Sequence, residues 1–193
     1  MIEGSPKEVV PVEVRRFSDE ARDALINAGY IIYALSGQSV RNHYEQGRKF
    51  SSTWHRYDQY EAFENKASMI SEVAIKPRTP FIPDSNNKTQ KQQEDLIIKF
   101  SNDLSVEIKG VEAIMGEAPD YVELAFAHLD STGDRLFGEN YDYNCARTKT
   151  LTSSSSGVLV GDFRDDYGLD IDTWFPDEGD TDIFAYPLIV PSN

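Results

Sequence analysis

The chain has 193 residues, of which 39% are hydrophobic and 11% aromatic, and a formal net charge of −14. This length and composition suit one folded domain and exclude a wholly disordered chain. An acidic chain repels a phosphate backbone, which argues against nucleic-acid binding through a basic surface, and no apolar run has the length of a signal peptide or a membrane span.

The chain contains one cysteine, Cys145, so no internal disulfide can form. Together with the lack of a signal peptide, this predicts a soluble protein in a reducing compartment, which for this sequence means a cytoplasmic location and no membrane association.

The first half of the chain predicts an irregular arm over residues 1–11, rich in glycine and proline, followed by a single domain over residues 12–191. A helix is expected over 18–28, because Ser18 is a suitable N-cap and an apolar stripe at helical spacing follows it. Aromatic and β-branched residues predict a strand over 30–35, and alternation of apolar and polar residues predicts another over 71–76. The mixed stretch 50–68 has no clear assignment.

Two further helices have clearer signals. Thr89 and Gln92 match the capping-box spacing at the start of an amphipathic helix over 89–103. A strand with a glycine break is expected over 106–115. The next helix spans 119–130, with Pro119 in its first turn and Gly133 just after its end.

From residue 143 the apolar pattern changes to period two, which predicts strands near 143–151, 158–163, 169–175 and 182–190. The short connections are rich in turn-forming residues, as in an antiparallel meander. The expected fold class is therefore α+β: a mixed, mainly antiparallel sheet with three helices packed on one face and a C-terminal four-stranded antiparallel meander.

The charge is distributed unevenly. Residues 101–193 carry 5 Lys and Arg against 19 Asp and Glu, which accounts for the whole net charge. The segment 162–182 alone holds nine carboxylates and one cation, Arg164. A solvated surface that keeps the protein dispersed is the simplest interpretation. A surface for a basic protein partner, a mimic of nucleic acid and a cation site are the alternatives.

A cation site would use Asp162, Asp170 and Asp172, because the strand pattern puts Asp170 and Asp172 on one face with Asp162 near them. Calcium or magnesium is the metal that such oxygen ligands prefer. The order of acids lacks the calcium-loop pattern, so solvated turns remain the alternative. The sequence contains no phosphate-binding loop or other motif for an organic cofactor.

An anion or substrate site would use Arg147 and Lys149, which the strand pattern puts on one face, with His128 as an acid or base. The alternative is structural: the two cations pair with neighbouring carboxylates, and His128 packs against the core from its helix.

Three stretches, SEVAIKPRTPFIPDSNNKTQKQQE, GEAPDYVELAFAHLDSTGDRLFG and FAYPLIVPSN, together resemble a family of small bacterial proteins of unknown function. The resemblance implies a bacterial protein and one domain over roughly residues 12–191, and it implies no activity, ligand or catalytic residue.

Two classes of function are consistent with these observations. The first is a non-enzymatic binding or interaction protein whose acidic C-terminal face meets a basic partner or a cation. The second is a small enzyme acting on an anionic or nucleotide-like substrate. The sequence does not decide whether the protein is an enzyme.

Overall fold

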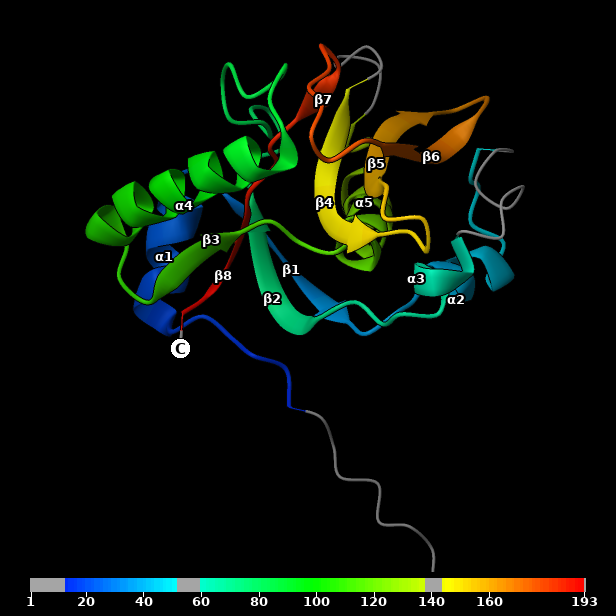
Figure 1. The fold of residues 1–193 in the computed structure, drawn as a ribbon. Coiled ribbons are helices and arrows are strands. Elements are labelled where there is room, and N and C mark those ends of the chain that lie inside the picture. Colours follow the sequence, from blue (N-terminus) through cyan, green and yellow to red (C-terminus); the bar gives the residue numbers. More distant parts are fainter. Residues whose placement is uncertain (1–12, 52–59, 138–143, 193) are drawn as a thin grey trace, which may run out of the picture.

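The computed structural model describes residues 13–51, 60–137 and 144–192. In these parts the chain forms an α+β structure with two four-stranded sheets (Figure 1). Its helices are α1 (Asp19–Asn27), α2 (Val40–Glu45), α3 (Glu61–Glu64), α4 (Gln90–Glu107) and α5 (Ala118–Thr132). Its strands are β1 (Ile31–Ser36), β2 (Ile70–Ile75), β3 (Val111–Ile114), β4 (Cys145–Leu151), β5 (Gly157–Arg164), β6 (Gly168–Trp174), β7 (Ile183–Phe184) and β8 (Leu188–Pro191). The α+β class expected from the sequence is confirmed.

Some of the sequence-based predictions fall outside the described residues. They concern the arm over 1–11, residues 52–59 of the unassigned stretch 50–68, and the first residue of the strand expected from 143. Within the described part of 50–68, the short helix α3 lies beside α2.

The expected helix boundaries are confirmed at their capping residues. The Ser18 hydroxyl accepts a hydrogen bond from the Ala21 backbone N–H at 3.2 Å, at the start of α1. At the start of α4, the Thr89 hydroxyl accepts from the Gln92 N–H at 3.3 Å, and the Gln92 side chain accepts from the Thr89 N–H at 2.9 Å. Helix α5 ends at Gly133 in the left-handed conformation, with φ 79°. Local side-chain chemistry therefore decides where these helices begin and end.

Helix α4 is longer than expected. The sequence predicted its end at residue 103 and a strand from 106, but the helix continues to Glu107 and β3 starts only at Val111. Leu104 continues the buried stripe of the helix, and the next left-handed glycine is Gly110, with φ 79°. The turn residue, rather than the strand propensity of the valine and isoleucine before it, sets the boundary.

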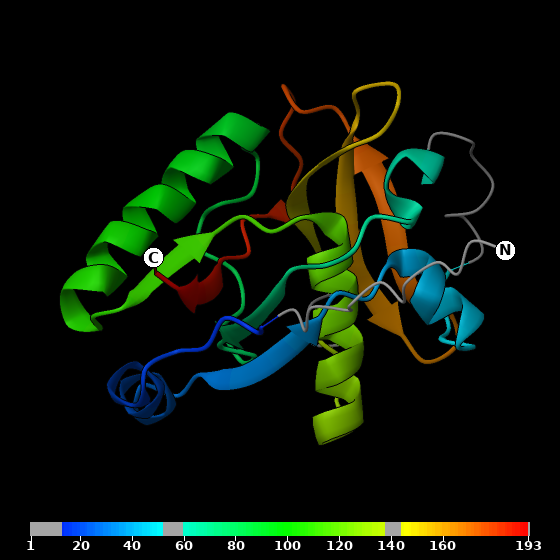
Figure 2. The same ribbon diagram turned by 90° about the horizontal axis from the view of Figure 1, so that it is seen from below.

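The first sheet has the strand order β1-β2-β8-β3, and each neighbouring pair is antiparallel. The strands expected over 30–35 and 71–76 pair directly, with Ile31 opposite Ile75 and Ser36 opposite Ile70. Both faces of this sheet are covered. Apolar residues of α1 and α4 form one cluster with one face, and α5 packs on the other face together with the second sheet (Figure 2). The prediction of three helices on one face was wrong for α5.

The second sheet has the order β6-β5-β4-β7. Strands β4, β5 and β6 form the expected antiparallel meander, but the fourth strand does not continue it. The segment expected as one strand over 182–190 is divided: β7 pairs parallel to β4, and β8 crosses to the first sheet, where it lies between β2 and β3. The prediction of a four-stranded antiparallel meander is therefore wrong in its last strand. The chain leaves the second sheet after β7, and Tyr186, between β7 and β8, is buried in the core between the two sheets.

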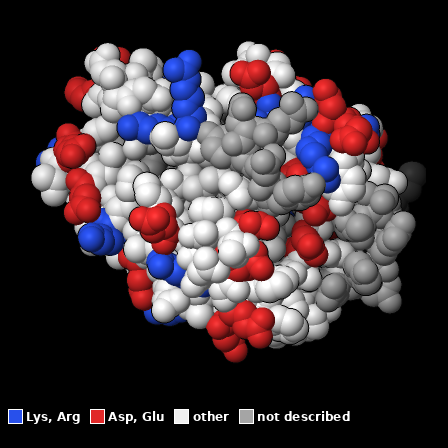
Figure 3. Space-filling model, turned by 90° about the horizontal axis from the view of Figure 1, so that it is seen from above, with Lys and Arg blue, Asp and Glu red and all other residues white. Residues whose placement is uncertain are grey.

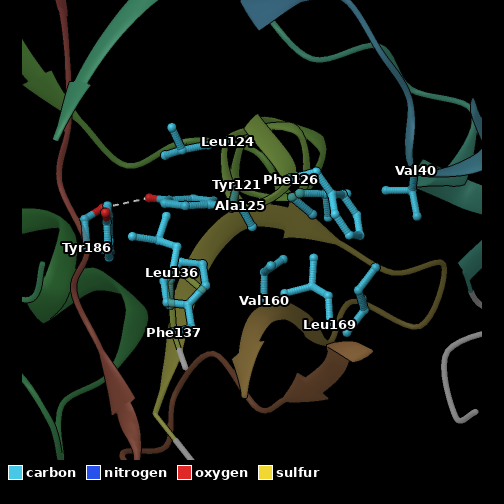
Figure 4. Packing of buried hydrophobic residues seen from close by; sticks show 14 of the residues in the cluster. Val40, Tyr121, Leu124, Ala125, Phe126, Leu136, Phe137, Val160, Leu169 and Tyr186 are labelled. Atoms are coloured by element: carbon cyan, nitrogen blue, oxygen red, sulfur yellow. Dashed lines mark hydrogen bonds between the residues drawn. The ribbon is translucent and has the colours of Figure 1, made fainter. Parts of the chain in front are cut away.

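Helix α5 lies between the two sheets and is buried on most of its surface (Figure 4). The Tyr121 hydroxyl donates to the carbonyl of Tyr186 at 2.7 Å and accepts from the Gly116 backbone N–H at 3.1 Å. These bonds join the start of α5 to the segment between β7 and β8. Burial raises the pKa of the Tyr121 hydroxyl, so it stays neutral.

One carboxylate of α5 organises the chain at the end of β1 and just before β2. Glu123 is only 6% exposed, and it accepts hydrogen bonds from the Ser36 backbone N–H at 2.8 Å and the Ser36 hydroxyl at 2.7 Å. It also accepts from the Gln38 N–H at 3.1 Å and from the Ser68 hydroxyl. A buried charge is tolerated when such donors replace its water. Glu123 thereby holds the exit of β1 and the approach to β2 against the helix.

Across the described residues, no helix combines the length and the apolar composition that crossing a membrane requires.

Candidate functional site

The three aspartates expected to bind a cation lie in the second sheet. Asp170 faces Gly161 across β5–β6 and accepts a hydrogen bond from the Ser51 hydroxyl. Asp162 pairs with Arg164 at 3.0 Å, and burial raises the pKa of its carboxyl. Asp172 accepts the Thr173 backbone N–H at 2.7 Å. Within the described ranges, no group of three or more His, Cys, Asp or Glu side chains is arranged to hold a metal ion.

The acidic surface is also interrupted. On the face seen from above in Figure 3, acidic side chains occur in separate groups, with Lys and Arg between them and no continuous ridge among the described residues. Several acids of the C-terminal half pair with cations of the same chain, as Asp165 does with Arg135. A nucleic-acid mimic would need carboxylates spaced like phosphates along a ridge.

Arg147 has a structural environment. Its side chain is 0% exposed, although it lies on a strand of the acidic half. Its guanidinium donates to the Gln93 side-chain oxygen at 3.0 Å, the Phe175 carbonyl at 3.3 Å and the Glu178 carbonyl at 2.9 Å. The residue thus joins β4 to α4 and to the segment after β6, and its donors are directed at protein atoms.

Lys149 does not share this environment, although it lies two residues further along β4. Its side chain is exposed, and its backbone N–H donates to the Gly116 carbonyl at 2.8 Å. The register of β4 against β5 shifts between Arg147 and Leu151. Such an irregularity breaks the alternation that puts residues i and i+2 in equivalent places. The structure therefore does not bring Arg147 and Lys149 together.

His128 lies elsewhere, on α5, and is 4% exposed. Its Nδ1 is 2.6 Å from the hydroxyl oxygen of Tyr33. The Tyr33 hydroxyl makes no other hydrogen bond within the described parts, so its O–H is satisfied only if it donates to Nδ1. The neutral ring then carries its proton on Nε2. Burial lowers the pKa of His128, while the carboxylate of Asp134 acts in the opposite direction.

His128 lines a pocket with a volume of about 950 Å³, which we call the α1–α5 pocket. The end of α1, the start of β1 and the end of α5 contribute to its walls. Its lining residues come from these elements, from the turn after β2 and from the β5–β6 turn: Ala28, Gly29, Ile31, Lys76, Pro77, Arg78, Thr79, His128, Thr132, Gly133, Asp134, Arg135 and Asp165. Neither Arg147 nor Lys149 belongs to this lining. The volume is within the usual range for a pocket that binds a small molecule.

The α1–α5 pocket gathers cations in an otherwise acidic protein. Lys76 is half-buried, with its ammonium 4.7 Å from the centre of the Tyr30 ring. Among the described residues, no carboxylate lies within ion-pair distance of Lys76. Arg78 is exposed two residues further on. Arg135 is held more firmly, because it pairs with Asp165 and its guanidinium lies 5.6 Å from the centre of the Phe163 ring.

The sequence contains no motif that marks Lys76, Arg78 and Arg135 as one group. The sequence signal for two of these cations is the order Lys-Pro-Arg-Thr directly after Ile75, at the end of a predicted strand. Loops after sheet strands commonly carry binding residues. The sequence does not show that this turn meets the end of α5, about fifty positions away in the chain. Only His128 was identified as a candidate in advance.

A second histidine, His43 on α2, is buried without a hydrogen-bond partner. It is 5% exposed, and neither ring nitrogen is bonded to a described residue. Its ring packs on Phe126 with 5.2 Å between the ring centres. Burial lowers its pKa, opposed by the carboxylates of Glu123 and Asp130 and reinforced by Arg48. The folded state therefore holds His43 neutral.

We expect the free energy of unfolding to fall as the pH drops below about 6.5, the usual pKa of histidine in an unfolded chain. Below that pH, His43 binds a proton in the unfolded chain but stays neutral in the folded protein, until the pH reaches its lowered pKa in the folded state. This group contributes at most about 1.4 kcal/mol per pH unit. Urea unfolding between pH 7.5 and 5.5 measures the slope. His43→Leu should give a shallower slope, and an identical slope in both proteins would contradict the prediction.

Comparisons with protein-family models, with curated proteins and with solved structures find no match for this chain.

Proposed function

We propose that the protein binds a small anionic molecule in the α1–α5 pocket. The observation that carries the proposal is the meeting of Lys76, Arg78 and the Nε2 side of His128 in one pocket of about 950 Å³. Each of these groups can donate a hydrogen bond to an anionic oxygen. Ile31 and Pro77 add apolar surface to the same lining.

The rest of the molecule supports the same choice. The protein has a net charge of −14, so most of its surface repels an anion. An anion is attracted only where cations such as Lys76 and Arg78 lie together. Lys76 has no carboxylate partner in the described chain, which distinguishes it from the paired Arg135 and Arg164. The acidic C-terminal surface is less favoured as the binding face, because its described acids are divided among separate local contacts.

A catalytic role for the same pocket is the second candidate, favoured by the hydrogen bond of 2.6 Å between Tyr33 and His128. This bond orients the ring and leaves Nε2 to exchange a proton with a bound molecule. Binding is the more economical proposal, since it requires no nucleophile or second acid–base group.

Titration with inorganic phosphate and with adenosine monophosphate tests the binding proposal. Backbone amide chemical shifts should change at residues 76–79 and 128–135, and binding should weaken as ionic strength rises. The double variant Lys76→Gln, Arg78→Gln should weaken binding at least about tenfold, which corresponds to about 1.4 kcal/mol.

The matched control is Lys91→Gln, Lys99→Gln, which removes the same charge from exposed positions on α4. It should leave the affinity almost unchanged. Shifts that map elsewhere, or an equal loss in the control, would refute the assignment of the pocket and indicate only non-specific attraction.

A further inference from the structure

The α1–α5 pocket is not uniformly basic, and its second wall has the opposite polarity. Two helices end there: Ala28, the C-cap of α1, and Gly133, the C-cap of α5, both line it. The last carbonyl groups of a helix have no partners within it and carry a partial negative charge of about half an elementary charge. Neither helix has a basic residue in its last turn to neutralise this charge.

A full negative charge lies on the same wall. Asp134 directly follows the C-cap of α5, is exposed, and lines the pocket. Its backbone N–H donates to the Thr132 hydroxyl at 3.1 Å, which places the residue against the end of the helix. Among the described residues, no Lys, Arg or His lies within ion-pair distance of its carboxylate. The other carboxylate of the lining, Asp165, is already paired with Arg135.

Two charges of opposite sign in the pocket, on Lys76 and Asp134, therefore form no ion pair with any residue that the structure describes. Lys76 lies in the turn after β2, and Asp134 lies at the end of α5. They line one pocket without forming an ion pair with each other. Two charges that line one pocket without pairing do not neutralise each other, so each can attract a group of opposite charge on a ligand. His128 lies within reach of the negative wall, because Asp134 influences its pKa.

We infer that the ligand of the α1–α5 pocket is a zwitterion. Its anionic group lies at Lys76 and Arg78, and its ammonium group lies at Asp134 and the carbonyl end of α5. The inference rests on the proposed function, because it assigns the anionic group to the same two cations. It adds the second charge and the residue that recognises it. A ligand with only an anionic group would leave Asp134 unpaired and would be repelled by it.

Two sets of three probes test the inference, each with one carbon chain: 6-aminohexanoate, hexanoate and hexylamine; phosphoethanolamine, ethyl phosphate and ethylamine. Affinities come from amide chemical-shift titrations of residues 76–79 and 128–135. In at least one set, the zwitterion should bind about tenfold or more tightly than either analogue with a single charge, which corresponds to about 1.4 kcal/mol. Asp134→Asn should reduce the affinity for the zwitterion to that for the anion alone, and it should leave or raise the affinity for the anion.

The outcomes separate the inference from the proposed function. If the anions bind as tightly as the zwitterions, and Asp134→Asn strengthens both equally, the zwitterion inference is overturned and the anion pocket stands. If only the amines bind, or if no probe shifts these residues, both are overturned. Because Asp134 is exposed, Asp134→Asn should keep the thermal midpoint of the original protein. Asp130→Asn, one turn earlier on α5 and outside the lining, is the control and should leave every affinity unchanged.

Discussion

Glu123→Ala should lower the free energy of unfolding by about 3–5 kcal/mol. The carboxylate is 6% exposed and satisfies two backbone N–H groups and two hydroxyls, from Ser36, Gln38 and Ser68. Its removal leaves the buried Ser68 hydroxyl and the partly buried donors of Ser36 and Gln38 without an acceptor, and an unsatisfied buried group costs about 1–3 kcal/mol. Urea unfolding followed by circular dichroism measures the loss.

Asp130→Asn is the matched control for this prediction. Asp130 lies on the same helix and pairs with Arg48 through two bonds of 2.5 and 2.7 Å, but both side chains are partly exposed. Solvent screens such a pair, so its loss should cost less than about 1 kcal/mol. If the two variants lose the same stability, Glu123 does not hold β1 and β2 in the manner described.

Arg147→Met should lower the free energy of unfolding by about 3 kcal/mol. Met approximates the length of the buried side chain, so the loss comes mainly from the three acceptors on Gln93, Phe175 and Glu178. The Gln93 amide cannot turn to compensate, because its nitrogen already donates to the carbonyls of Ser85 and Ile183, each at 2.8 Å. Chemical denaturation at neutral pH provides the measurement.

Lys149→Met is the corresponding control on the same strand. It removes the same charge from an exposed side chain, so the stability should change by no more than about 0.5 kcal/mol. Neither substitution should alter anion binding, because neither residue lines the α1–α5 pocket. If Lys149→Met abolished phosphate binding, the result would instead support the sequence-based hypothesis of an anion site at Arg147 and Lys149.

The local signals in the sequence predicted local structure well. Thr89 and Gln92 make the predicted capping box, and Gly133 adopts the left-handed conformation expected just after α5. Such features depend on neighbours within three or four positions, so the sequence contains the information needed to predict them. The strands expected over 30–35 and 71–76 are also present, as β1 and β2.

The candidate site was predicted only in part. His128 was identified, but Lys76, Arg78 and Asp134 were not, because their meeting depends on how the turn after β2 packs beside the end of α5. For Arg147 the alternating strand pattern left two interpretations, a site for an anion and a pair with neighbouring carboxylates. Alternation does not reveal that Gln93 of α4 and the segment after β6 accept the hydrogen bonds of its guanidinium, and the sequence gives no sign of the register shift before Leu151.

The sequence by itself determined the α+β class, the capping of the main helices and the concentration of acids in residues 101–193. Only the tertiary structure decided that β8 leaves its neighbour β7 for the other sheet, that α5 lies between the sheets, and that Lys76 and Asp134 line one pocket. The physical reason is the range of the interactions. Caps and turns are stabilised by bonds between near neighbours, whereas strand order and pocket walls are chosen by the burial of apolar surface between segments far apart in the chain.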